Sequence, residues 1–256
     1  MNTQTVYEFP LNERIRVLMR LEQLFQQLDH FMNGSTIFDK RAAVSTLLDI
    51  LMIFSRNDLK SELLKELDRH STTLTQIANN QGVDIEKLEK ILYELKTISN
   101  KLYDTSGRIG VGVMDSDLFQ SISQRNSIPG GTCSFDLPAF HFWLEQDHSI
   151  QQQDLERWTQ PLADIRIAIK LTLNFIRQSS IPTQEIASSG FFQLALDKSQ
   201  PFQLLIVAIE STLPYFAEIS GGKHRFSIRF MSPSSDNNRP SQVADDITFL
   251  LTRCIF

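Results

Sequence analysis

Cysteine is scarce in this sequence, which has only two among its 256 residues, Cys133 and Cys254. They lie far apart and neither belongs to a CxxC pair, which argues against a disulfide framework or a zinc ribbon and is typical of a reducing compartment. The five histidines also lack the spacing of a helical metal site such as HExxH. We therefore expect neither a metal site nor a cofactor.

Long apolar runs and an excess of basic residues are also missing. No apolar stretch reaches the roughly 18–20 residues that cross a bilayer, and residues 1–10 lack the basic and apolar regions of a signal peptide. We expect a cytoplasmic protein without membrane insertion. Lys and Arg total 25 against 30 Asp and Glu, a formal net charge of −5, whereas nucleic-acid-binding domains usually carry a basic excess. Any anionic partner must therefore bind a local basic patch.

Complete catalytic and nucleotide-binding motifs are absent as well. The pair Gly222-Lys223 is similar to the end of a phosphate-binding loop, but the next residue is His224 rather than Ser or Thr. Cys133 and His141 could form the nucleophile and base of a hydrolase, but a small buried cysteine near a turn is the commoner situation. We predict that the protein is not an enzyme.

Helical periodicity dominates residues 12–178. Apolar residues recur every three or four positions in four stretches, at about 12–33, 39–54, 58–78 and 84–102. The candidate caps are Asn12, either Asn57 or Asp58, and Asp84. Shorter helices are expected at about 117–124 and 139–144. A long helix should run through 165–178, with Pro161 near its start or at a kink. We predict a helical-bundle domain over residues 12–178.

From about Ser179 the pattern changes to short runs of β-branched and aromatic residues separated by Gly, Pro, Ser and Asn. The runs fall at 191–196, 202–209, 215–219, 225–231 and 247–251, and they predict an antiparallel sheet. Residues 5–10 alternate in the same way, so we expect the N-terminal segment to join this sheet. The prediction is an α+β fold, with a β-domain formed from residues 1–11 and 179–256.

The strand expected near residues 223–231 has two faces of different character. Because side chains alternate along a strand, one face is apolar and the other mainly basic: Phe226, Ile228 and Phe230 against Lys223, Arg225, Ser227 and Arg229. No acidic residue occurs from 220 to 231, so we expect a local positive patch. Three basic residues alone are more often an ordinary solvated face. A nucleic-acid-binding or regulatory module that uses this face remains an alternative.

Six segments, found in order along nearly the whole chain, resemble the ZapD family of FtsZ-associated cell division proteins. They are residues 11–16 (LNERIR), 62–69 (ELLKELDR), 127–131 (SIPGG), 133–138 (CSFDLP), 175–179 (FIRQS) and 219–231 (ISGGKHRFSIRFM). The resemblance implies a homodimer with a helical domain and a β-domain. Each protomer would bind the C-terminal tail of FtsZ, the tubulin-like division protein, so that the dimer crosslinks and bundles FtsZ filaments and promotes Z-ring assembly at midcell.

The resemblance also implies which residues bind this partner. Arg225 and Arg229 match the centre of the tail site, and Lys223 lies on the same face. Three further positions match the family pattern: Arg56 at a helix end, Arg16 on the first helix, and His141, which could equally pack internally.

Overall fold

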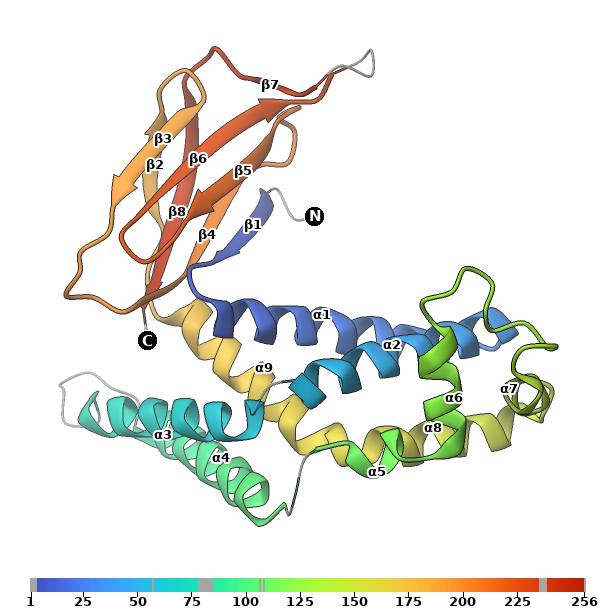
Figure 1. Cartoon of the computed structure of the whole chain (residues 1–256). Helices are drawn as coiled ribbons and strands as arrows, with labels where there is room; N and C mark the ends of the chain where they lie inside the picture. The colour runs from blue at the N-terminus through green and yellow to red at the C-terminus, as the bar shows by residue number, and fades with distance from the viewer. Residues whose placement is uncertain are drawn as a thin grey trace. The chain divides into compact units, whose positions relative to one another are not determined.

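The computed structural model describes residues 4–56, 58–77, 85–105, 107, 109–234 and 239–255, except for the side chains of Ile77 and Lys87. Helices and antiparallel sheets are both present, which confirms the predicted α+β class. The chain divides into two compact units (Figure 1): Leu18–Thr172 is helical, and Met1–Val17 with Leu173–Phe256 contains all the described strands. The division falls inside the first and last α-helices.

The α-helices, in chain order, are α1 (Glu13–Asn33), α2 (Ile37–Arg56), α3 (Leu59–Ile77), α4 (Ile85–Asp104), α5 (Val111–Met114), α6 (Asp117–Arg125), α7 (Pro138–Leu144), α8 (His148–Thr159) and α9 (Ala163–Gln178). Helices α3 and α4 lie side by side (Figure 1). Pro161 lies in a short 3₁₀ turn, Gln160–Leu162, between α8 and α9. Asn57, residue 78 and Asp84, which were expected as a candidate cap, the end of one helix and the cap of the next, lie outside the described residues.

Local side-chain hydrogen bonds explain where α2 and α3 begin. The Thr36 hydroxyl accepts the N–H of Asp39 at 3.1 Å and the Asp39 carboxylate accepts the N–H of Thr36 at 3.0 Å, a reciprocal capping arrangement. It starts α2 at Ile37, two residues before the predicted start. Asp58, one of the two candidate caps, caps α3, since its carboxylate accepts the N–H of Ser61 at 3.3 Å.

One fully buried cation joins three helices of the helical unit. Lys40 of α2 is 0% exposed, and its ammonium group donates to the Met32 carbonyl at 2.9 Å and to the Gln152 side chain at 3.4 Å. Burial lowers the pKa of Lys40. The ammonium thereby satisfies a carbonyl at the C-terminal end of α1 that the helix itself leaves without a partner.

The second unit, Met1–Val17 with Leu173–Phe256, is called the β-unit below and contains two antiparallel sheets. Its strands are β1 (Gln4–Pro10), β2 (Thr183–Ala187), β3 (Phe191–Ala195), β4 (Phe202–Glu210), β5 (Phe216–Gly221), β6 (Arg225–Ser232), β7 (Ser241–Gln242) and β8 (Ile247–Ile255). One sheet has the order β1-β4-β8-β2 and the other β3-β6-β5, with β7 paired to β6. Both sheets contribute to one apolar core. In this core the centre of the Phe249 ring lies 5.2 Å from that of Phe230 and 5.3 Å from that of Phe192.

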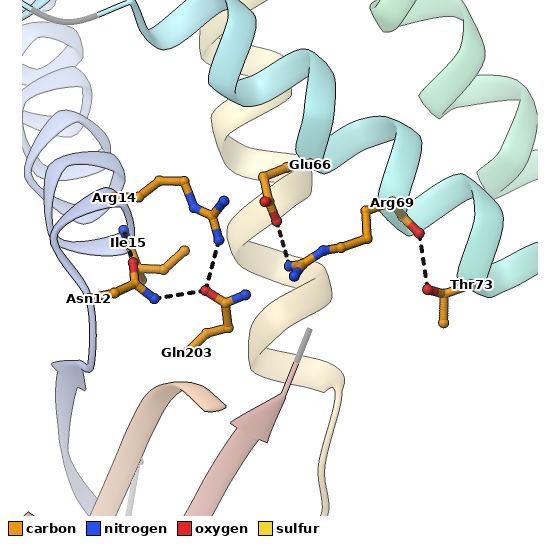
Figure 2. Close-up of polar contacts among 7 residues, drawn as sticks. All are labelled: Asn12, Arg14, Ile15, Glu66, Arg69, Thr73 and Gln203. Carbon is orange, nitrogen blue, oxygen red and sulfur yellow. Dashed lines mark hydrogen bonds and ion pairs between the residues drawn. The ribbon is translucent and has the colours of Figure 1, made fainter. Parts of the chain in front are cut away.

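The N-terminal strand is an edge of the first sheet, since β1 pairs with β4 from Gln4 opposite Glu210 to Pro10 opposite Leu204. The chain then enters α1 through Asn12, whose carboxamide oxygen accepts the N–H of Ile15 at 3.0 Å (Figure 2). The Asn12 amide donates to Gln203 at 2.8 Å. The residue that caps α1 is therefore also bonded to β4.

Arg177 of α9 holds β1 by a two-point ion pair. Its guanidinium contacts the two carboxylate oxygens of Glu8 at 2.7 and 2.9 Å, and both side chains are about three-quarters buried. Bidentate arginine–carboxylate pairs of this kind fix orientation as well as distance. In the helical unit, Figure 2 shows a local pair within α3, in which Arg69 contacts Glu66 at 2.6 Å.

Candidate functional site

The outward face of β6 carries the residues that the sequence marks as a candidate binding surface. Phe226, Ile228 and Phe230 are at most 1% exposed, whereas Arg225 and Arg229 are exposed. The predicted alternation of apolar and basic side chains is therefore present. The strand is the middle one of its sheet, between β3 and β5, so its two arginines project from the centre of the sheet face rather than from an edge.

Lys223 departs from the prediction, because it lies in the turn between β5 and β6 and not in the strand itself. The turn is closed by a hydrogen bond from the Gly222 N–H to the Arg225 carbonyl at 3.0 Å. Gly221 permits the close approach of the two strands, since a Cβ at this position would lie 2.6 Å from the Cβ of Phe226. The lysine is exposed, two residues before the arginine that opens β6.

A depression with a volume of about 490 Å³ lies over this turn and the adjoining strands. Its lining includes all three predicted basic residues and combines cationic, hydroxyl, amide and aromatic groups: Phe191, Gln193, Ser220, Gly221, Gly222, Lys223, His224, Arg225, Phe226, Ser227 and Arg229. The Ser220 and Ser227 hydroxyls lie 2.9 Å apart across the strands. The floor therefore offers hydrogen-bonding groups between the two arginines.

The basic side chains of this face are available to a ligand. Within the described part of the chain, no carboxylate forms an ion pair with Lys223, Arg225 or Arg229, and no hydrogen bond engages their side-chain nitrogens. One acidic residue from outside the segment 220–231 nevertheless lies on this face. Glu218 of β5 is the cross-strand partner of Arg229, because the register of the sheet places it there.

The depression also contains residues that the sequence analysis did not single out, namely Phe191 and Gln193 of β3, Ser220 of β5, and His224. Gln193 is the cross-strand partner of Ser227, and Phe191 is that of Arg229. Strand pairing thus places residues of β3 beside residues of β6 that lie more than 25 positions away in the sequence. Periodicity within one segment indicates which face a residue occupies but not which strand lies beside it.

The other three predicted residues do not line this depression. Arg16, in the same unit, pairs with Glu13 at 3.2 Å, and its guanidinium lies 5.7 Å from the centre of the Phe9 ring. In the helical unit, Arg56 is exposed at the end of α2 and lines a separate depression of about 350 Å³ with Phe54 and Lys60, among others. The structure thus gathers Lys223, Arg225 and Arg229 in the lining of one depression.

The cysteine–histidine pair does not have the features of a catalytic site. Cys133 is exposed, contrary to the expectation of a buried thiol, whereas Cys254 is buried and its pKa is raised to about 12, chiefly by burial. His141 is exposed on α7 rather than packed internally, 3.8 Å from Glu145. No hydrogen bond joins Cys133 and His141, both of which the structure describes.

Nowhere in the described part of the chain do three or more His, Cys, Asp or Glu side chains gather as a possible metal site. Among the helices described, none is both long enough and apolar enough to cross a membrane.

Comparison with known proteins gives one consistent result. A family model described as "ZapD: Cell division protein" matches residues 19–229. The chain is 48% identical over 255 residues to "Cell division protein ZapD" of Methylococcus capsulatus, with all of both chains covered. It is 42% identical over 248 residues to the protein of that name from Nitrosomonas eutropha (97% and 98% covered). The identity to the Nitrosomonas europaea protein is 40% over 252 residues (98% and 95% covered).

Proposed function

Because this chain belongs to the ZapD family of cell division proteins, we propose that it binds the C-terminal tail of FtsZ on the basic face of β6. A role in cell division follows from the family itself. The partner and the binding surface are what we propose beyond this role.

The observation that carries the proposal is the pair of exposed arginines on β6, which form no ion pair with any residue that the structure describes. Arg225 and Arg229 project from one face of a regular strand, and Lys223 stands beside them in a depression of about 490 Å³. A short flexible tail with acidic and apolar side chains fits such a surface, since carboxylates meet guanidinium groups and the apolar side chains can contact Phe191. The Ser227 hydroxyl between the arginines can bond the tail backbone.

The proposed activity requires two such sites. A two-fold homodimer presents the same surface twice, so that one dimer binds the tails of two FtsZ subunits in neighbouring filaments. Each contact can be weak, because many dimers along aligned filaments act together through avidity. Crosslinking of this kind bundles filaments and favours assembly of the Z-ring.

No covalent chemistry is needed for this activity, and we propose that the protein acts without catalysis or a cofactor. The same binding would recruit it from the cytoplasm to the division site at midcell. Arg56 and His141, both exposed, are secondary candidates for tail contacts. Arg16 is a weaker one, since Glu13 and the Phe9 ring already engage it.

Charge reversal on β6 tests the placement of the site. The double variant Arg225→Glu, Arg229→Glu should abolish co-sedimentation with FtsZ filaments and filament bundling while leaving the protein folded. A matched control reverses two other exposed cations of the same unit, Lys198→Glu and Arg239→Glu, for an equal change of net charge. Unchanged co-sedimentation of the β6 variant, or equal loss in both variants, would refute the placement.

A further inference from the structure

The outward face of the β3-β6-β5 sheet changes character along its strands. The cations Lys223 and Arg225 lie at the start of β6 or just before it. In the middle of the strand, Ser227 lies between an amide side chain of β3 and a hydroxyl side chain of β5. Towards the end of β6, Met231 lies directly opposite Phe216 of β5. The face therefore runs from cationic through polar to apolar groups.

Three apolar side chains gather where the strand ends. Residues directly opposite on antiparallel strands project from the same face with Cβ atoms about 4.5–5.5 Å apart, and diagonal neighbours are about 7–8 Å apart. Met231 is the direct partner of Phe216, and Phe191, the partner of Arg229, is its diagonal neighbour. All three are partly exposed, and none is among the described side chains that form or adjoin the apolar core. We call Phe191, Phe216 and Met231 the apolar end of this face.

Acidic residues do not distinguish the two ends. Asp197 follows β3 near the turn between β5 and β6, since the N–H of the residue before it donates to the His224 carbonyl at 2.8 Å. Towards the other end, Glu218 is the cross-strand partner of Arg229. Each end thus has a carboxylate and at least one cation close by. What differs is the presence of large apolar side chains on the outward face.

We infer that the FtsZ tail binds this face in two parts, an inference that rests on the proposed tail binding. Its acidic part lies over Lys223 and Arg225, and its large apolar side chains pack against the apolar end. The two parts of the surface are continuous, because Phe191 and Arg229 occupy the same row of the sheet. The cations attract the tail from a distance, whereas the apolar end contributes by removing apolar surface from water.

The spacing along the strand defines the class of ligand. Arg229 and Met231 are four and six residues from Arg225, which is about 13 and 20 Å at a rise of about 3.3 Å per residue. The ligand is therefore an extended segment with an acidic residue and, about four to six positions away, one or two large apolar residues. Its binding combines a charged contribution that salt screens with an apolar contribution that salt does not screen.

Two protein variants separate these contributions. Binding of a labelled peptide with the last residues of FtsZ is measured by fluorescence anisotropy at about 0.05 and 0.3 M salt. The apolar variant Phe216→Thr, Met231→Thr changes no charge and keeps residues that suit strands. Its dissociation constant should rise about tenfold at both salt concentrations, as expected when a few tens of Å² of apolar surface stay in water. Arg225→Gln should raise the constant mainly at the lower salt concentration.

A matched control and a change in the peptide complete the design. Val6→Thr, Ile186→Thr removes two apolar side chains that are 51% and 57% exposed on strands of the other sheet, and it should leave binding unchanged. A peptide with its large apolar residues replaced by serine should bind the unmodified protein about as weakly as the apolar variant binds the original peptide. Combining both changes should add little. The peptide arm does not depend on the folding of a variant.

The outcomes separate this inference from the proposed function. Undiminished binding of the serine peptide, or binding by the apolar variant as tight as that of the control variant, overturns the two-part inference and leaves tail binding in place. So does a loss in the apolar variant that disappears at the higher salt concentration. Failure of the original peptide to bind the unmodified protein at either salt concentration overturns both.

Discussion

The turn between β5 and β6 offers a stringent test, because two adjacent glycines there have opposite surroundings. A Cβ added to Gly221 would lie 2.6 Å from the Cβ and 3.0 Å from the Cα of Phe226. Phe226 is 1% exposed in the core of the β-unit, so it cannot move aside freely. At Gly222, an added Cβ meets nothing within 4 Å. Neither glycine has a positive φ, so the contrast is one of space and not of backbone strain.

The expected magnitudes follow from these contacts. Overpacking against a buried backbone costs about 1–3 kcal/mol, so Gly221→Ala should lower the free energy of unfolding by that amount. In a protein of this size the melting temperature should fall by roughly 2–4 °C per kcal/mol. Gly222→Ala should be neutral or stabilise the protein by up to about 1 kcal/mol, since alanine restricts the unfolded chain.

Urea unfolding of the two single variants measures the difference, and tail-peptide binding gives a second readout. Gly221 fixes the turn that carries Lys223 and leads into Arg225, so Gly221→Ala should also weaken peptide binding. Gly222→Ala should not destabilise this turn and so should not weaken peptide binding in that way. Equal stability of the two variants would refute the close strand approach on which the shape of the depression depends.

Other predictions concern thiols, acid and salt. In the native protein, an aromatic disulfide reagent at pH 8 should modify the exposed Cys133 and leave Cys254 unreacted until the protein unfolds. The reason is that Cys254 is buried and its pKa is raised to about 12. Equal labelling of both cysteines would contradict the structure. Hydrogen bonds from Ser61 lower the pKa of Asp58 below 3.8, so this carboxylate contributes stability above pH 3.8 that is lost as the pH falls through its lower folded value. In acid unfolding of the two proteins, the Asp58→Asn variant should lack this pH-dependent loss of stability. Filament bundling should weaken as salt rises from 0.05 to roughly 0.3 M, because exposed charge contacts are screened, and light scattering that is independent of salt would count against a charged site.

The sequence predicts best those elements whose own residues carry the signal. Asn12 was expected to cap the first helix, and its side chain does so. The alternation around Phe226 and Arg225 predicted the two faces of β6 because each face is uniform in character. In both cases the information lies within a few neighbouring residues, so no knowledge of the tertiary structure is needed.

Elements with few buried apolar residues were missed. Helix α8 was not predicted, because one of its core positions is polar: Gln151 is 5% exposed and donates to the carbonyls of Trp143 and Leu144 at 3.2 and 2.9 Å. Strand β2 buries only Ala187, which leaves little alternation to detect. Both elements are recognisable only from the tertiary contacts that they make.

The composition of the site could be predicted only in part. The three basic residues follow from one segment, but Phe191, Gln193 and Glu218 reach the same face through pairing with β3 and β5. Strand order and register depend on the packing of the whole β-unit. The full set of side chains on this face therefore becomes visible only in the folded structure.

Tail binding is tested most directly by sedimenting assembled FtsZ filaments together with this protein, using full-length FtsZ and FtsZ that lacks its last residues. Both kinds of filament are assembled before the protein is added, so that the tail is the single difference between the samples. The protein should pellet with full-length filaments and bundle them, and it should remain in the supernatant with the truncated ones. Equal pelleting with both would contradict tail binding as the basis of its function.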